Sequence, residues 1–355
     1  MHKISGALAA LTIALTGAEP ALADPSPPAQ APAPLGVFGA DMPAPGKLVF
    51  SFLPSFALMQ GSRIDTHVVS SPFIVTHVIS PYTPVGTHDL RLAPNNLSIH
   101  TQGFALAYGL NSDITLFAST AVIEKAVDMQ AFKGLSGATS LGFSTGRTSG
   151  LGDTTVATIV RVAHDRTNRL NLNFGLSLPT GSTTDLITLL LPNGTSPAKR
   201  GFYAMQPGTG TVDALVGATY SGVQGPWSWG ASYRARVPLD RNPQGWAYGD
   251  LHEANGWGGY TWMPGLETTF RVNGTVQGHI QGEDPGIRGY AQGADPFFYG
   301  GEQISLYGGV IVGGRFVGAP AAQFGVEAGA PVYQRLNGPQ LGRDWQVNVA
   351  LKYKL

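Results

Sequence analysis

The last stretch of the chain, residues 345–355, alternates between apolar and polar side chains. Each odd-numbered position is apolar, and the positions between them include Lys352 and Lys354. This period of two is typical of a β-strand with one apolar face and one wet face. A tilted transmembrane strand needs about 9 to 11 residues, which this stretch supplies. The stretch therefore predicts either a strand of a membrane barrel or the edge strand of a soluble sandwich.

Other segments with strand character precede the last one. The clearest runs from Arg169 to Leu178, where Leu170, Leu172 and Phe174 alternate with Asn171 and Asn173. The strands predicted before the last one span residues 47–59, 97–108, 113–122, 154–163, 169–178, 211–220, 227–237, 248–262, 266–281, 303–312 and 323–333. With residues 345–355 this makes about twelve strands.

The connections between these strands alternate in length. Long connections follow the first, third, fifth and ninth strands, and tight turns follow the second, fourth, sixth and eighth. Outer-membrane barrels have this asymmetry and an even number of strands, whereas a sandwich has no reason to sort its loops by end. We therefore expect an all-β fold, a transmembrane antiparallel up-and-down β-barrel of about 12 strands over residues 47–355. Its first and last strands must pair, because an open edge is not tolerated in lipid.

Aromatic residues gather at the predicted short-turn end of these strands. Amphipathic rings prefer the membrane–water interface. The residues expected to form such a girdle are Tyr108, Tyr220, Trp227, Tyr260, Trp262 and Tyr353.

The composition agrees with a strand-built membrane protein. Glycine accounts for 48 of 355 residues and charged residues for 12%. No stretch approaches the ~20 apolar residues of a membrane-spanning helix, so insertion would have to use strands. The formal net charge is zero and no basic run occurs, which argues against nucleic acid as a partner. The chain has no cysteine, so disulfides do not stabilise it.

The N-terminal residues read as an export signal. Residues 1–23 combine Lys3, an apolar run and the sequence Ala21-Leu22-Ala23, which fits a signal peptide and its cleavage site. Residues 24–46 are expected to be a Pro-rich leader and N-terminal segment outside the barrel. The expected location is the bacterial outer membrane. Its lipid and the barrel-assembly machinery, acting through the C-terminal strand, are the expected partners.

Several turn motifs together resemble one family. They are S-G-L-G-D at 149–153, L-S-L-P-T-G-S at 176–182, M-Q-P-G-T-G-T at 205–211, W-S-W-G-A at 227–231, Y-G-D at 248–250, G-E-D-P at 282–285 and L-N-G-P-Q-L at 336–341. In this order they are similar to the outer-membrane family named for the MetA pathway of phenol degradation, from Gly36 onward. The resemblance implies a transporter-like barrel associated with the handling of aromatic compounds.

Charged side chains of both signs fall on the predicted inner face. The candidates for a lumen constriction are Arg161, Arg234, Arg236, Glu253, Glu267, Arg271, His279 and Glu327. One interpretation is a salt-bridged lumen that stiffens and partly fills the barrel. The other is a constriction in which the arginines select solutes, as charged rings do in pores.

Motifs for catalysis and metal binding are weak. Ser144 lies in a G-x-S-x-G match at 142–146, but a nucleophile elbow needs a strand before it and a helix after it, and this segment reads as an external loop. His67, His77, His88 and His100 are too widely spaced for a compact zinc site. A barrel-embedded hydrolase would need Ser144 or His279 beside a carboxylate. We expect no enzyme, no metal and no cofactor.

The expected function is a porin-like outer-membrane channel or transporter for passive passage of small solutes of aromatic or apolar character. The alternative is a structural or adhesion-type barrel with a closed lumen that binds through its external loops.

Overall fold

The computed structural model describes residues 33–83 and 89–355, which form one closed antiparallel barrel. Thirteen strands share its main sheet, and two of them, β2 (His67–Val68) and β5 (Ser140–Leu151), lie off the ring. The eleven ring strands are β1 (Leu48–Asp65), β3 (Leu92–Gly109), β4 (Ile114–Phe132), β6 (Thr154–His164), β7 (Asn168–Leu178), β10 (Asp213–Gln224), β11 (Trp227–Pro238), β13 (Leu251–Met263), β14 (Leu266–Gln277), β16 (Gly301–Gly313) and β17 (Ala322–Lys354).

The last ring strand, β17, crosses the wall twice. A single extended strand of 33 residues would be about 110 Å long. Instead, residues 323–336 pair with β16 and residues 336–354 pair with β1. The backbone N–H of Lys354 donates to the carbonyl of Ala321 at 2.9 Å, so the two ends of the segment lie side by side. Ten single strands and the two passes of β17 give twelve crossings, close to the sequence prediction.

Pairing of the first and last strands closes the ring, as the sequence predicted. Val49 lies opposite Lys354 and Phe52 opposite Leu351, and the N–H of Leu355 donates to the carbonyl of Leu48 at 2.8 Å. No open edge remains between β1 and β17. The fold class inferred from strand alternation, an all-β closed antiparallel barrel, is therefore confirmed.

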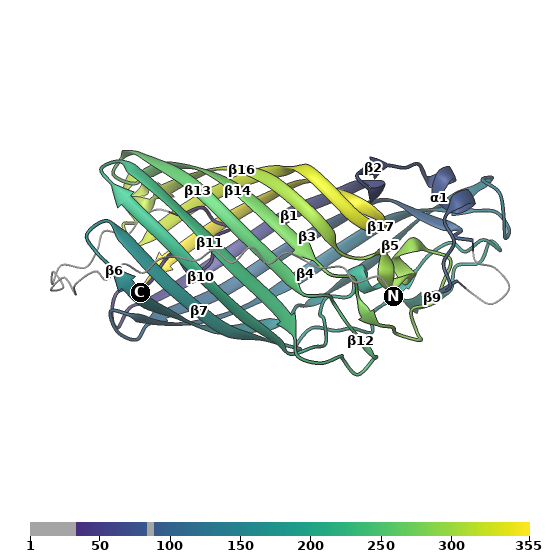
Figure 1. Cartoon of the computed structure of the whole chain (residues 1–355), viewed down its shortest axis with the longest axis horizontal. Coiled ribbons are helices and arrows are strands. Elements are labelled where there is room, and N and C mark those ends of the chain that lie inside the picture. Colours follow the sequence, from purple (N-terminus) through teal and green to yellow (C-terminus); the bar gives the residue numbers. More distant parts are fainter. Residues whose placement is uncertain (1–32, 84–88) are drawn as a thin grey trace, which may run out of the picture.

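The two ends of the barrel differ, as Figure 1 shows. At the end that carries the C-terminus, called here the turn end, residues 110–113, 165–167, 225–226 and 264–265 connect the strands. The η4 turn (Gly314–Val317) lies in the connection between β16 and β17. The opposite end, the loop end, carries the remaining short elements: β2, α1 (Ser71–His77), β8 (Leu186–Thr188), β9 (Ala198–Arg200), η1 (Tyr203–Met205), β12 (Trp246–Ala247), β15 (Gln281–Gly282), η2 (Gln292–Ala294) and η3 (Pro296–Phe298). Among the described residues no helix is long and apolar enough to cross a membrane.

Local chemistry explains the tight turns. Asn111 Oδ1 accepts the N–H groups of Asp113 and Ile114, both at 2.8 Å. Asp165 Oδ1 accepts the N–H groups of Thr167 and Asn168, both at 2.7 Å. Such side-chain acceptors replace backbone acceptors where a strand reverses.

One predicted loop is a strand, which corrects the sequence interpretation. The sequence favoured a long loop between residues 122 and 154, but β4 continues to Phe132 and the chain returns as β5. The first part of β4 pairs with β6 and the second with β5. Thus β5 and β6 form one returning pass, interrupted at Gly152 and Asp153.

The barrel is apolar outside and polar inside. Exposed apolar side chains on the ring strands include Leu106, Leu116, Phe174, Val216 and Phe270. Buried polar side chains of the same strands include Asn171, Asn173, Thr219, Asn255 and Arg271. This arrangement is the reverse of a soluble sandwich and follows from the period-two alternation.

Candidate functional site

A cavity of about 670 Å³ lies inside the barrel. Leu35 and Gly36 of the N-terminal segment line one side of it, and Phe202, Met205 and Tyr299 of the loop-end segments line another. Strands β1, β3, β4, β11, β13, β14, β16 and β17 also contribute lining residues. The cavity therefore lies in the lumen between the N-terminal segment and the loop-end segments.

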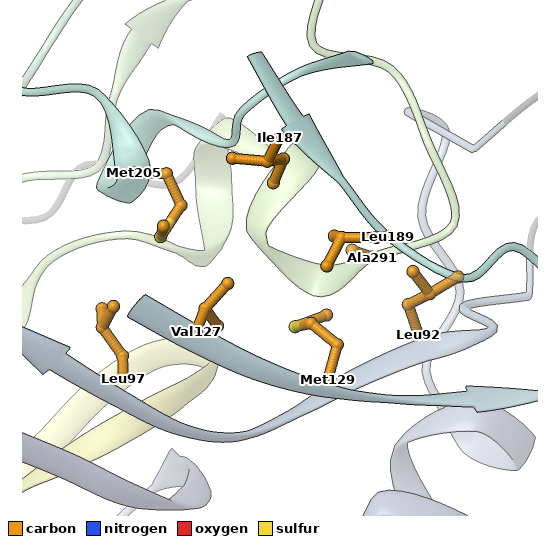
Figure 2. Close-up of a cluster of buried hydrophobic side chains, with 8 residues drawn as sticks. All are labelled: Leu92, Leu97, Val127, Met129, Ile187, Leu189, Met205 and Ala291. Carbon is orange, nitrogen blue, oxygen red and sulfur yellow. The ribbon is translucent and has the colours of Figure 1, made fainter. Parts of the chain in front are cut away.

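One side of the cavity is apolar and is called here the apolar wall. Leu97 of β3, Val127 and Met129 of β4, and Met205 of η1 line it and are nearly fully buried. The connection between β7 and β10, residues 179–212, contains β8, β9 and η1 and is called here the inserted loop. Figure 2 shows the side chains of Leu97, Val127 and Met129 on the barrel strands facing those of Met205 and Ile187 on this loop. Met59, Phe202 and Leu341 pack against the same cluster. An apolar cluster in the lumen of a polar-lined barrel favours apolar ligands over ions.

Hydrogen bonds hold the inserted loop against the wall. Lys125 Nζ donates to the carbonyls of Ala204 at 2.8 Å and Gln206 at 2.7 Å. Thr148 Oγ1 donates to the carbonyl of Met205 at 2.6 Å. These bonds satisfy the carbonyl groups of a turn that is buried inside the barrel.

A tyrosine and tryptophan cluster supports this loop from the loop end. Tyr203 and Trp246 are fully buried, with ring centroids 4.9 Å apart, and the Tyr248 hydroxyl donates to the carbonyl of Tyr203 at 2.9 Å. The Tyr203 hydroxyl accepts the N–H of Asp284 at 3.0 Å. Burial raises the pKa of Tyr203 to about 12 and that of Tyr248 further. Both hydroxyls therefore stay neutral at physiological pH.

The opposite side of the cavity, the polar wall, centres on a buried ion pair. Arg271 Nε donates to Glu327 Oε1 at 3.0 Å and Arg271 Nη2 to Glu327 Oε2 at 2.8 Å. The guanidinium also lies 4.1 Å from the centroid of the Tyr307 ring and donates to Asn255. Only 4% and 1% of these two charged side chains are exposed. Glu327 therefore neutralises the positive charge of Arg271 within the protein.

A second ion pair adjoins the first. Arg234 Nη2 donates to Glu253 Oε2 at 2.6 Å across the β11–β13 ladder. Glu253 Oε1 accepts from Asn255 at 3.2 Å and from Asn273 at 3.0 Å. Of the candidates predicted from sequence, Arg234, Glu253 and Arg271 line the cavity, and Glu327 pairs with one of them.

Residues 33–46 precede β1 and are called here the plug segment, because Phe38, Gly39 and Asp41 contact side chains of the inner barrel wall. Asn171 Nδ2 donates to the carbonyl of Gly39 and Thr219 Oγ1 to that of Phe38, both at 2.8 Å. Lys352 Nζ lies 2.5 Å from Asp41 Oδ2. Sequence reasoning placed residues 24–46 outside the barrel and missed that residues 33–46 contact its inner wall, because the partners Asn171, Thr219 and Lys352 are distant in sequence. Residues 1–32, including the predicted signal peptide, lie outside the described residues.

The other predicted lumen residues lie away from the cavity. Arg236 pairs with Asp213 at 2.5 Å and with Asp153 at 3.5 Å, and Asp153 accepts the N–H groups of Gly181 and Thr209. This node fixes both ends of the inserted loop. Arg161 lies 3.9 Å from Asp113.

Glu267 and His279, also predicted as lumen residues, differ in burial: Glu267 has a buried carboxylate oxygen and His279 is exposed. Glu267, near the turn end of β14, has a buried Oε2 without a hydrogen-bond partner in the described part of the chain. The placement of His279 in the lumen is wrong, because β14 ends at Gln277. His279 is exposed beyond that end and lies against Phe297, with centroids 5.0 Å apart.

The predicted girdle residues gather near the turn end. Tyr108, Tyr220, Trp227, Trp262 and Tyr353 are 39–63% exposed. The Tyr260 ring lies between Trp227 and Trp262, with centroids 4.7 and 4.8 Å away. Their role as an interfacial girdle remains a prediction.

The weak catalytic and metal motifs can also be placed. Ser144 lies on β5 rather than in a loop, and its Oγ accepts the N–H of Leu190 at 3.0 Å. His67 and His100 are exposed, and His88 lies outside the described residues. Within residues 33–83 and 89–355, no three metal-ligating side chains gather.

A closed antiparallel ring around a lumen cavity defines the protein as a closed antiparallel β-barrel. No protein-family model and no curated protein matches the chain. The COG4313 outer membrane channel from Pseudomonas putida F1 has a similar structure, with a TM-score of 0.58 at 16% identity, covering 91% of this chain and 100% of that chain. This similarity shows the fold, and membership in the MetA-pathway family remains a prediction.

Two transporter structures are more distant. The Ralstonia pickettii toluene transporter TbuX matches with a TM-score of 0.40 at 13% identity, covering 88% of this chain and 89% of that chain. The P. putida toluene transporter TodX gives 0.37 at 10% identity, covering 87% and 88%. Neither supports an argument about this chain.

Proposed function

We propose that the protein is a bacterial outer-membrane channel for the passive passage of small aromatic or apolar solutes. The apolar wall inside an otherwise polar lumen carries this proposal. Leu97, Val127 and Met129 would not be needed around the cavity of a water-filled pore. They would stabilise an apolar solute there, because the free energy of such a solute falls when it leaves water.

Three further features support the membrane part of the proposal. The ring strands expose apolar side chains such as Phe174 and Phe270, the ring has no open edge, and aromatic rings gather near the turn end. A signal peptide over residues 1–23, recognition of the C-terminal strand by the assembly machinery, and association with phenol degradation complete the proposal. No covalent chemistry is required.

Uptake by cells tests the proposal, because the outer membrane itself limits the entry of apolar compounds. The rate of uptake of radiolabelled toluene is measured in a bacterium that lacks its own aromatic channels, with and without the protein. We expect faster uptake with the protein. Equal rates with and without it would contradict the proposal.

Two variants of β4 show whether the solute uses the cavity. Val127→Trp fills space at the apolar wall, where Val127 is 4% exposed. Val122→Trp adds the same volume on the same strand at a position that is 37% exposed on the outer surface. We expect Val127→Trp to slow uptake and Val122→Trp to leave it unchanged.

A closed-lumen structural barrel is the second candidate. The plug segment and the compensated pairs Arg271–Glu327 and Arg234–Glu253 favour it, because they fill and stiffen the lumen. Such a barrel would give neither solute uptake nor swelling of liposomes in isotonic arabinose. Toluene uptake that is sensitive to Val127→Trp would exclude it.

A further inference from the structure

One charge beside the cavity has no counter-ion among the residues that the structure describes. Arg234 pairs with Glu253, Arg271 with Glu327, and Arg335 with Glu302. Arg343 also lines the cavity, and among the described residues no carboxylate oxygen lies within 4.0 Å of its guanidinium. Arg335 and Glu327 do not line the cavity themselves but neutralise Glu302 and Arg271, which do, so Arg343 leaves one positive charge among the described lining residues.

The surroundings of Arg343 hold it in place without neutralising it. Its Nη1 donates to Gln346 Oε1 at 2.5 Å, and its Nε is buried with no described partner. The Gln334 side chain accepts the backbone N–H of Arg343 at 2.8 Å and donates to its carbonyl at 3.0 Å. Gln346 in turn donates to Asn348, and Asn348 to Glu327. A chain of neutral amides therefore connects Arg343 to the polar wall.

Arg343 lies where the polar and apolar walls meet. In the β1–β17 ladder it is opposite Met59, and Leu341 is two residues away on the same strand. Both of these apolar side chains pack against the cluster of Leu97, Val127 and Met129. A molecule lying along the apolar wall would thus have one end near a guanidinium.

We propose that the preferred solutes are amphipathic anions, in which an aromatic ring or short chain carries a carboxylate at one end. This proposal rests on the proposed function and adds the charge of the solute. The apolar part lies on Leu97, Val127 and Met129, and the carboxylate pairs with Arg343. A partly buried cation without a counter-ion is unfavourable, and a carboxylate satisfies both its charge and its free donors.

Three ligands with the same phenylbutyl group and different end groups test whether the cavity prefers an anion. Binding of 4-phenylbutyrate, 4-phenyl-1-butanol and 4-phenylbutylamine is measured by titration calorimetry, with the full-length protein in a non-ionic detergent at pH 7.4 and low salt. The carboxylate is ionised there, because its ordinary pKa is about 4 to 5. We expect the carboxylate to bind about tenfold more tightly than the alcohol, as for a hydrogen bond to a charged group. The amine should bind most weakly.

Variants assign the preference to Arg343. Arg343→Gln should remove the difference between carboxylate and alcohol and leave alcohol binding intact, and Arg343→Lys should retain part of it. Arg315→Gln removes an exposed arginine at the turn end and should change nothing.

The outcomes separate the two proposals. Equal binding of carboxylate and alcohol by the wild type, or a preference for the amine, would overturn the anion proposal and leave the channel proposal standing. Failure of all three ligands to bind would contradict the apolar cavity as a solute site. If Arg343→Gln does not fold, the three-ligand comparison on the wild type still decides.

Discussion

Arg271 of β14 and Glu327 of β17 bond through two pairs of atoms, although β16 lies between their strands. The Arg271 side chain reaches Glu327 past Tyr307, whose ring centroid lies 4.1 Å from the guanidinium. The pair thus connects alternate strands on the lumen side, where ladder hydrogen bonds connect only neighbours. It braces the polar wall of the cavity.

Breaking this pair should cost considerable stability. In Glu327→Gln the buried Arg271 loses its counter-charge, which typically destabilises a protein by about 3–5 kcal/mol. We expect a correspondingly lower free energy of unfolding, measured by urea titration of the protein folded in lipid vesicles. The double variant Arg271→Met, Glu327→Leu should lose less, because no uncompensated charge remains. Wild-type stability of Glu327→Gln would show that the pair contributes little.

The plug segment should respond to a very small change. A Cβ added to Gly36 would lie 2.3 Å from Arg271 Nη2, so Gly36→Val cannot keep the present contact. We expect the segment to move and the conductance in planar bilayers to rise. The control is Val37→Ala, which shortens a neighbouring side chain without adding volume. Unchanged conductance in Gly36→Val would mean that residues 33–46 do not limit ion flow.

The strands of the ring could be predicted because each has one apolar outer face. The strand predicted at 169–178 differs from β7 by one residue at its start. The missed strand β5 has the sequence S-L-G-F-S-T-G-R-T-S-G-L, whose glycines and hydroxyl residues are typical of a loop. It is a strand because the extended β4 offers an edge for pairing, which is a tertiary effect.

The site could be predicted only where strand parity is regular. Parity placed Arg234, Glu253, Arg271 and Glu327 on the inner face of ladder stretches that have no register shift beside these residues. Counting by twos from Trp345 assigns Arg343 to the outer face, but a register shift between Leu58 and Met59 reverses the parity there. A bulge of one residue moves every later side chain to the other face, and sequence alone does not reveal it.

Lys125 should control the mobility of the inserted loop. Lys125→Met keeps the length of the side chain but removes the donor to the carbonyls of Ala204 and Gln206. Leaving buried carbonyls unsatisfied costs about 1–3 kcal/mol. Amides of residues 203–206 should therefore exchange with deuterium about tenfold faster or more, as measured by mass spectrometry. Lys199→Met, which removes an exposed lysine of β9, is the control, and equal exchange in both variants would contradict this role.

Asp165 should make the β6–β7 turn sensitive to acid. The backbone N–H groups of Asn168 and Thr167 hold the pKa of its carboxyl below the usual value. The folded state thus favours the ionised form, and the resulting stability is present above the unfolded pKa of about 4 and lost as pH falls through the lower folded pKa. Asp165→Asn keeps an acceptor at Oδ1 but removes the charge. We expect its urea midpoint to lie below that of the wild type at pH 7 and to approach it at pH 2.5; an equal difference at both pH values would show that the charge is not responsible.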